Sequence, residues 1–289
     1  MLTHYICPNG QVTDINQCLE RCIINKEFDC GRCVSFRFLR QMAAQRSWSG
    51  IPSVTQLLSG VRAEFLKITK NYAANPQNLV AALFGAACHS LLEHASDDRF
   101  LCETRLLDPT GSYSGQFDCY DKVEQTLYDT KTFGSFKVAQ ILGLEKVKTP
   151  IVDHITGEIL KSPRGTTRYN TSFKIGVRRM FDVTLQLNAY RIMLEHAGFP
   201  VRHMRLEVFV RDGGTWIAKD RGITQNALLI NVNRLPDRHV QAYFLEKAKR
   251  LVSAVNSNKI PPLCRPVETW GGAKCNGFCV VKDFCKEVQ

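Results

Sequence analysis

Long hydrophobic runs are missing from this sequence. The longest candidate, Leu79 to Cys88, is about half of the roughly 18 residues that a membrane-spanning helix needs, so we expect no membrane span. The start of the chain lacks a basic segment followed by an apolar stretch, the arrangement typical of a secretory signal. Internal repeats and low-complexity tracts are also missing. These absences favour an ordinary folded protein of the cytoplasm.

Acidic residues are scarce relative to basic ones. The 289 residues include 27 Asp and Glu against 38 Lys and Arg, which gives a formal charge of +11. With 44% hydrophobic and 22% charged residues, the composition is that of a globular chain and excludes a disordered one. The length suits one large domain or two modest ones. The unusual features are therefore the positive charge and the twelve cysteines.

Nine of the twelve cysteines lie near the two ends of the chain, five in the first 33 residues and four in the last 26. Thiols stay reduced in the cytosol, so closely spaced cysteines there favour zinc or an iron–sulfur cluster over disulfides. The alternative is a set of unpaired buried thiols. Packing roles are expected for the three remaining cysteines, Cys88, Cys102 and Cys119.

The N-terminal group predicts a four-cysteine site for zinc or an iron–sulfur cluster. Cys18 and Cys22 are four residues apart, which places both on one side of a helix. Cys7 lies in the turn sequence Cys-Pro-Asn-Gly, which suits a ligand loop. The favoured ligands are Cys7, Cys18, Cys22 and Cys33, with Cys30 as the alternative to Cys7.

The C-terminal group predicts a second four-cysteine site. Cys264, Cys275, Cys279 and Cys285 fall within 22 residues, in a segment with several glycines that allow the backbone to wrap a metal centre. Zinc and a [4Fe–4S] cluster both fit this spacing, and the spacing does not decide between them.

Positive charge is concentrated between Lys131 and Met180. This segment holds ten Lys and Arg against three Asp and Glu, which is +7 of the total +11. Such a concentration attracts polyanions, and aromatic rings among the cations can stack on unpaired bases. The alternative is a solvated basic loop without a ligand. The candidate DNA-binding residues are Arg62, Lys137, Arg164, Arg168, Tyr169, Lys174, Arg178 and Arg179.

The pattern between the cysteine groups predicts an α/β protein with a mixed central sheet flanked by helices. Apolar spacing indicates a helix that Pro52-Ser53 opens and that continues to Phe65. Further helices are expected over about 78–94, 183–196 and 236–254. Strands are expected over 105–107, 115–120, 126–132, 204–211 and 227–232, with a β-rich excursion over 141–176.

Four polar motifs follow one another in this core. They are Gly85-x3-His89-x3-Glu93 on a helix, Gly115-x2-Asp118 and Asp129-Thr130-Lys131 on successive strands, and Gln186-x3-Tyr190 on a later helix. Spacings of four keep helical residues on one face, and strand alternation sends Asp129 and Lys131 to the same face.

The motif side chains suit metal-assisted chemistry. His89, Asp118 and Asp129 combine an imidazole nitrogen with carboxylate oxygens, a set that fits Mg²⁺ or Mn²⁺. Lys131 can neutralise negative charge that develops at a phosphodiester, while Gln186 and Tyr190 can position the substrate. Each motif alone is more often structural, as a packed histidine, a salt-bridged surface pair or a helix face. The order of all four motifs is what points to a site.

The ordered set resembles the PD-(D/E)XK nuclease superfamily in its RecB-like branch, which includes CRISPR-associated iron–sulfur exonucleases and related phage nucleases. The motifs stand here as GAACHSLLE, GQFD, DTK and QLNAY, and the resemblance covers roughly residues 50–285. It implies a restriction-endonuclease-like sheet and metal-dependent cleavage of DNA at ends or on single strands. The protein would then act in a bacterial cytoplasm or, as a phage protein, in that of the host.

The resemblance also implies roles for particular residues. It implies Mg²⁺ or Mn²⁺ ligation by His89, Asp118, Asp129 and the carbonyl of Thr130, with Lys131 catalytic. It implies supporting roles for Glu93, Gln186 and Tyr190.

The cysteines depart from the pattern of cluster-bearing members. In those members one cysteine, which precedes an arginine of the first helix, joins three at the C-terminus. Here Arg62 has no such cysteine, and the gap between Cys275 and Cys279 is three residues instead of two. Cys264 is then the expected fourth ligand, and zinc stays an alternative to the cluster.

The expected organisation has three parts. Residues 1–48 form a cysteine-rich metal-binding module, residues 49–260 form the nuclease core with a basic insertion at about 141–180, and residues 261–289 form the C-terminal cysteine segment. Two other functions stay open: a non-catalytic nucleic-acid-binding metalloprotein, and a restriction-type endonuclease on the same core.

Overall fold

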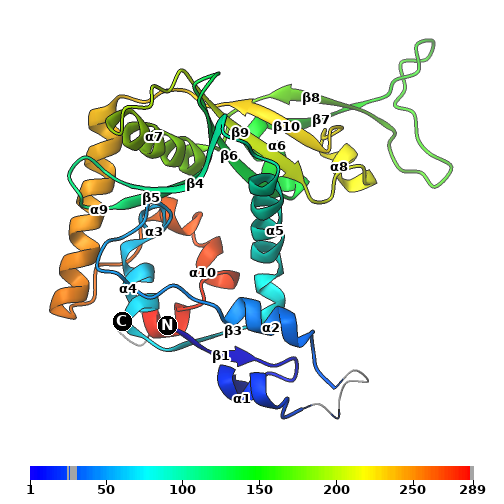
Figure 1. The fold of residues 1–289 in the computed structure, drawn as a ribbon. Helices are drawn as coiled ribbons and strands as arrows, with labels where there is room; N and C mark the ends of the chain where they lie inside the picture. Colours follow the sequence, from blue (N-terminus) through cyan, green and yellow to red (C-terminus); the bar gives the residue numbers. More distant parts are fainter. Residues whose placement is uncertain (25, 27–30, 287–289) are drawn as a thin grey trace.

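The main sheet of the protein has five strands in the order β10-β9-β6-β5-β4, in a computed structural model that describes residues 1–24, 26 and 31–286 (Figure 1). β6 runs parallel to β9, and the other neighbours are antiparallel. The strands are β4 (Phe100–Leu107), β5 (Ser114–Asp121), β6 (Thr126–Phe133), β9 (His203–Val210) and β10 (Ala227–Asn231). The prediction of an α/β protein with a mixed sheet flanked by helices is confirmed.

The helix α7 (Phe181–His196) forms the centre of the hydrophobic core. Almost every residue from Val183 to Leu194 is buried, because α7 packs on β4, β5, β6 and β9 on one side and contacts α9 (Asp237–Ser257) on another. Alternate residues of β9 face this core, as expected for a half-buried strand. The helices predicted over 183–196 and 236–254 agree with α7 and α9 to within a few residues.

The helix expected to start at Pro52-Ser53 is divided in two. α3 (Val54–Leu58) begins with a capping box between Ser53 and Gln56, as the N-cap sequence predicts. The chain then bends, and α4 (Val61–Thr69) starts at the N-cap Gly60. A Cβ at Gly60 would lie 2.2 Å from Sγ of Cys264, so the break brings the backbone against the C-terminal segment.

The C-terminal segment is fastened to the core by buried cations. Arg62 is 6% exposed, and its guanidinium donates to the carbonyl oxygens of Pro261 at 3.2 Å and Cys285 at 3.1 Å. Lys247 pairs with Glu268 at 2.7 Å and donates to the carbonyl of Ser59. Arg62 was expected to bind DNA. Its burial instead makes it a structural clamp.

The β-rich excursion is a hairpin that stands apart from the main sheet. β7 (Leu144–Pro150) and β8 (Tyr169–Ile175) pair along their whole length, and isolated bridges continue the pairing toward the tip. Residues of β8 are exposed throughout, and the arm projects away from the rest of the molecule (Figure 1). The hairpin is thus an arm and adds no strand to the core sheet.

The first residues build a small core of their own. β1 (Leu2–Ile6) pairs with β2 (Val12–Asp14), and the chain continues through α1 (Ile15–Glu20) to α2 (Phe36–Ala43). β3 (Tyr72–Ala74), which follows α4, returns to pair in parallel with β1. A separate buried cluster joins Tyr5, Ile15, Leu39 and Ala74, so residues beyond 48 complete this N-terminal module.

The remaining elements link these parts. η2 (Pro76–Leu79) leads from the N-terminal module into α5 (Val80–His94), which rises to the main sheet as a free-standing helix without a buried residue (Figure 1). The other short elements are α6 (Ser135–Leu142), α8 (Trp216–Asp220), η3 (Pro266–Thr269), α10 (Ala273–Gly277) and α11 (Lys282–Lys286). None of the helices within the described residues is long and apolar enough to cross a membrane.

Candidate active site

The candidate site lies where β5 and β6 separate. Their antiparallel ladder spans three residue pairs, from Asp121↔Thr126 to Cys119↔Tyr128. Past this point the backbone N–H of Thr130 donates to Oδ2 of Asp118 at 2.7 Å. The carboxylate thus replaces the missing backbone acceptor, and this hydrogen bond fixes it in the fork between the strands.

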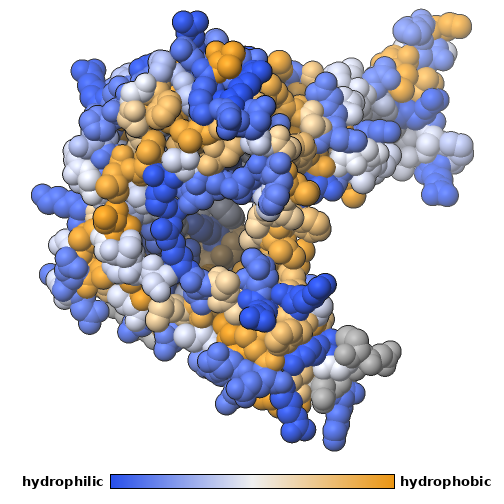
Figure 2. All heavy atoms as spheres, viewed as in Figure 1, coloured by the Kyte–Doolittle hydropathy of each residue, from blue (hydrophilic) through white to orange (hydrophobic). Residues whose placement is uncertain are grey.

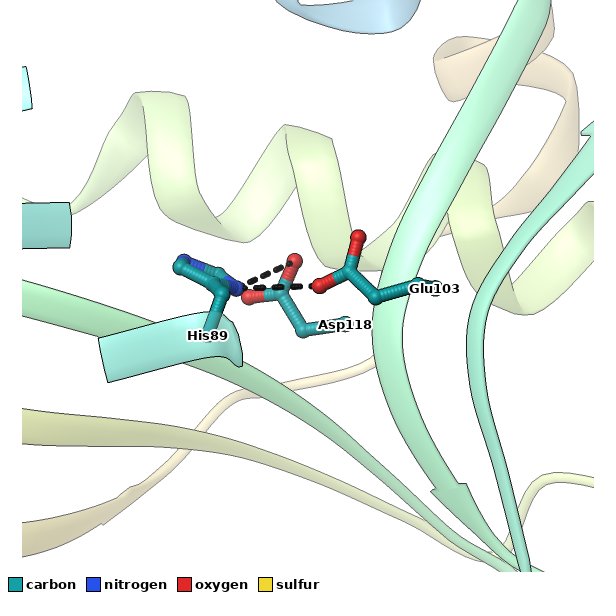
Figure 3. Close-up of side chains that lie close together, drawn as sticks. All are labelled: His89, Glu103 and Asp118. Atoms are coloured by element: carbon teal, nitrogen blue, oxygen red, sulfur yellow. Dashed lines mark hydrogen bonds and ion pairs between the residues drawn. The ribbon is translucent and has the colours of Figure 1, made fainter. Parts of the chain in front are cut away.

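Three side chains from three elements meet beside this fork (Figure 3). Nδ1 of His89, on α5, lies 3.2 Å from Oε1 of Glu103 and 3.6 Å from Oδ1 of Asp118. A ligand atom from each residue falls within 4.8 Å of the other two, as in a metal-binding group. The side chains are 26%, 24% and 13% exposed, so they are sheltered but reachable from solvent.

Glu103 is the member of this group that the sequence motifs did not identify. It lies opposite Asp118 on β4, between the strand pairs Cys102↔Cys119 and Thr104↔Phe117. Its φ of 47° is in the left-handed region, which is unusual for a residue other than glycine. No motif spacing marks it, and only strand register brings it to the site.

Lys131 connects the two aspartates of the motif set. Its ammonium donates to Oδ1 of Asp129 at 2.7 Å and lies 3.8 Å from Oδ2 of Asp118. This confirms that Asp129 and Lys131 face the same way on β6. Asp129 itself is fully buried, and its Oδ2 has no hydrogen-bond partner. It lies outside the His89, Glu103 and Asp118 group, contrary to the expected ligand set.

The charges of this cluster shift one another's protonation. Burial, followed by the negative charge of Asp129, raises the pKa of Asp118 to about 7, against the opposing effects of Lys131 and His89. Burial alone would lower the pKa of Lys131, but the charges of Asp129 and Asp118 raise it. The ammonium therefore stays protonated, and the site holds a surplus of negative charge that a cation would relieve.

Gln186 and Tyr190 support the site from α7. Nε2 of Gln186 donates to the hydroxyl of Tyr190 at 3.0 Å, and both residues are buried. A Cβ at Gly115 would lie 2.7 Å from the ring of Tyr190 and 2.8 Å from Sδ of Met193. The glycine of the second motif thus lets β5 approach the tyrosine of the fourth.

The group opens into a hollow of about 910 Å³. Figure 2 shows the molecule hollowed between the main sheet and the N-terminal module. Glu93, Tyr190 and the metal-binding group line it, together with α4 and the segment that leads to α3. The spacing of four between His89 and Glu93 thus directs both side chains into one cavity.

A polar chain leads from the group along the wall of the hollow. Nε2 of Gln116 donates to Glu103 at 2.7 Å, and its Oε1 accepts from Arg105 at 2.8 Å. Burial, followed by the nearby charge of Arg46, lowers the pKa of the Arg105 guanidinium. Arg46 and Arg105 both line this cavity.

The N-terminal cysteines gather around Cys18. Burial raises the pKa of the Cys18 thiol, and the nearby thiols of Cys22, Cys33 and Cys7 raise it further. Within the described residues no three cysteine sulfurs lie within 4.8 Å of one another. The alternative ligand Cys30 lies outside the described residues. Cys7, Cys22 and Cys33 thus lie near Cys18, and among the described residues these four do not form a closed metal site.

The C-terminal cysteines are brought together only in part. Cys264 is half-buried, and burial raises the pKa of its thiol against the effect of a hydrogen bond from the N–H of Ala63. Cys285 and Cys279 lie near enough to raise that pKa further, whereas Cys275 is exposed.

The candidate DNA-binding residues are distributed over the arm and its base. Lys137 lies on α6 and is half-buried. Lys174 pairs with Glu145 at 3.0 Å, and the ammonium of Lys148 lies 5.9 Å from the ring centre of Tyr169. The exposed members of the set are Arg164, Arg168, Tyr169, Lys174, Arg178 and Arg179.

Comparison with known proteins adds little to this geometry. No protein-family model matches the chain, and no curated protein matches it. One similar solved structure is the crystal structure of SSO0001, at 12% identity and a TM-score of 0.43, covering 87% of this chain and 93% of that one. At that TM-score the likeness carries no argument about fold or activity.

We expect opposite effects on stability from alanine at the two motif glycines. Gly115→Ala should lower the free energy of unfolding by about 1–3 kcal/mol, because the methyl group would overlap Tyr190 and Met193. Gly85→Ala is the matched control. Its Cβ meets nothing closer than 3.9 Å, so it should raise the same quantity by about 0.5–1 kcal/mol. Urea unfolding measures both, and equal midpoints would contradict the packing of Tyr190.

Asp118→Asn should stabilise the metal-free protein at alkaline pH. A carboxyl whose pKa is raised to about 7 on folding destabilises the folded state once it ionises. This loss of stability is absent at a pH below the pKa that Asp118 has in the unfolded chain. It is complete above about pH 7, where the carboxyl is ionised in the folded protein as well. We expect the variant to gain roughly 1–3 kcal/mol at pH 8 and almost nothing near pH 4, measured by unfolding in chelator. A gain that does not change with pH would refute this account.

Proposed function

We propose that this chain is a metal-dependent deoxyribonuclease with a restriction-endonuclease-like core, which acts on DNA ends or single strands. One observation carries the proposal: His89, Glu103 and Asp118 form a group within 4.8 Å, beside the ammonium of Lys131. Two carboxylates and an imidazole can hold a divalent ion, and a fixed ammonium can stabilise the negative charge that develops during phosphodiester hydrolysis.

The donor set fits Mg²⁺ or Mn²⁺. Carboxylate oxygens with one imidazole suit these ions, and the surplus of negative charge around Asp118 favours a cation there. His89, Glu103 and Asp118 would hold the ion, with Asp129 and the carbonyl of Thr130 close to Lys131 on the next strand. When bound, the ion supplies Lewis-acid polarisation of a phosphodiester.

The chain's own groups have distinct parts in this proposal. Asp129 holds the ammonium of Lys131 at 2.7 Å, so that it faces Asp118 and can stabilise negative charge on a phosphate. The Thr130 N–H keeps the Asp118 carboxylate in place. Gln186 and Tyr190 form the buried wall behind the site.

The shape and charge of the molecule support DNA as the substrate. The hollow of about 910 Å³ leads from the metal-binding group to the surface and offers room for a strand end or a single strand. The arm from Leu144 to Ile175 presents exposed cations with Tyr169 among them, a combination that binds nucleic acid backbone and bases.

We further propose that the two terminal cysteine groups bind structural metal centres. These centres would stabilise the fold and take no part in the reaction. The thiol of Cys264 accepts a hydrogen bond from the N–H of Ala63 in the first turn of α4, and Arg62 of that helix donates to the carbonyl of Cys285. A metal centre here would tie the last residues to the core. A [4Fe–4S] cluster or zinc fits the C-terminal four, and zinc or an iron–sulfur cluster fits Cys7, Cys18, Cys22 and Cys33.

The cleavage assay is the direct test of the nuclease proposal. With Mg²⁺ or Mn²⁺, the wild type should degrade single-stranded DNA, while Asp118→Asn, Glu103→Gln and Lys131→Met should each lose about 100-fold or more in rate. DNA binding in gel shifts should survive each change. Glu246→Gln, an exposed carboxylate on α9 that is 62% exposed, is the matched control and should cleave normally.

Two results would redirect the proposal. If Lys131→Met cuts at the wild-type rate, the site assignment is wrong. If chelator leaves gel-shift binding intact and no metal restores cleavage, the protein is a non-catalytic nucleic-acid-binding metalloprotein. Closed circular DNA set against linear DNA separates a restriction-type endonuclease from an exonuclease.

The cysteine proposal has its own measurement. Anaerobically purified protein should contain bound metal, and a broad visible absorption band would identify an iron–sulfur centre. Colourless protein with stoichiometric zinc would identify the alternative. Cys264→Ser should release the C-terminal centre and lower the thermal midpoint, whereas Cys88→Ser should change neither. Purified protein that contains neither iron nor zinc would refute the proposed structural metal centres.

A further inference from the structure

Two arginines share the hollow with the metal-binding group. Arg105 comes from β4 and Arg46 from the extended segment that leads into α3, and both line the cavity. Both side chains therefore border the same space as His89, Glu103 and Asp118. Neither motif spacing nor the basic segment of the sequence marks this pair.

Neutral partners hold Arg105 in place. Its guanidinium donates to the hydroxyl of Ser114 at 3.0 Å and to Oε1 of Gln116 at 2.8 Å. Neither acceptor carries a charge, so the positive charge of Arg105 is oriented without being neutralised. Gln116 also donates to Glu103. The side chain of Gln116 therefore connects the guanidinium of Arg105 to the metal-binding group.

Arg46 is positioned by its neighbour in the chain. Oε1 of Gln45 accepts from the N–H of Leu2 at 2.9 Å, and its Nε2 donates to the carbonyl of Leu2. This pair of hydrogen bonds fixes the segment against β1 at the edge of the hollow. Trp48, half-buried on the same segment, also lines the cavity.

The pair differs from Lys67, a further cation of the lining, whose ammonium contacts Glu64 at 2.8 Å. Among the described residues no carboxylate forms an ion pair with Arg46 or Arg105. Two guanidinium groups that line one cavity without a carboxylate partner can both pair with one anion. The arrangement therefore suits an anionic ligand.

We propose that Arg46 and Arg105 bind a phosphate of a nucleic acid strand beside the metal-binding group, with Trp48 available to stack on the adjoining base. Arginine suits this task, because its planar fork pairs with two phosphate oxygens at once. The phosphate is either an internal diester or a terminal monoester. This inference rests on the proposed nuclease function, since it names how the same hollow would hold its strand.

Binding in chelator tests the site without cleavage. A labelled single-stranded oligonucleotide should bind about tenfold more weakly to Arg105→Gln and to Arg46→Gln than to the wild type, and the salt dependence should fall by about one charge for each change. Arg238→Gln removes one charge from an exposed arginine of α9 outside the hollow and should bind within about twofold of wild type. Equal affinity of Arg105→Gln and Arg238→Gln would overturn the site.

Altered strands identify the phosphate itself. One neutral methylphosphonate linkage, moved along the oligonucleotide, should weaken wild-type binding at one position, and Arg105→Gln should be insensitive to it there. If a terminal phosphate is the ligand, its removal should weaken the wild type alone. An equal loss of affinity in the wild type and in Arg105→Gln would overturn the proposal. If Arg105→Gln does not fold, Arg46→Gln replaces it, because Arg46 is exposed.

The two proposals can fail separately. A wild type that never cleaves but shows the Arg46 and Arg105 effects in chelator would end the nuclease proposal and support the phosphate site. A wild type that cleaves with metal, while both arginine variants bind and cleave normally, would end the phosphate site and leave the nuclease.

Discussion

The site depends on one buried ionic contact, between the ammonium of Lys131 and the carboxylate of Asp129. Asp129 is fully buried and cannot be solvated, so its charge is tolerable only beside a cation. The same ammonium faces Asp118, whose carboxylate is also fixed by the Thr130 N–H where β5 and β6 part. The ammonium of Lys131 and the carboxylates of Asp118 and Asp129 are thus kept largely out of bulk water where the two strands separate.

The buried helix α7 covers one face of the sheet where β5 and β6 separate. Arg191 of α7 is fully buried and pairs with Glu195 at 2.7 Å and with Asp237 at 2.6 Å, the second on α9. The helix is thus held from behind by ion pairs and in front by Tyr190 against Gly115. The open side of the fork faces the hollow, where α5 stands without a buried residue and carries His89. Close packing on one side and an open cavity on the other are typical of a pre-formed ligand site.

Local sequence patterns were sufficient for most of the elements. The helix start at Ser53, the shared face of Asp129 and Lys131 and the spacing of His89 and Glu93 each concern residues a few positions apart, and the structure agrees with all three. The break at Gly60 was not predicted, and the close approach of Cys264 to Gly60 depends on the distant C-terminal segment. The roles of Arg62 and Glu103 were missed for the same reason: one depends on the C-terminal segment and the other on strand register.

Helix and strand periodicity are local properties of the chain, so they were enough to predict the α/β class and the shared face of Asp129 and Lys131. The order of the four motifs is likewise read from the chain alone. Tertiary structure alone decided that Glu103 joins His89 and Asp118, that Asp129 lies outside their group, and that Arg46 and Arg105 share a cavity. These contacts join segments that are brought together by packing. The spacing of residues along the chain therefore does not predict them.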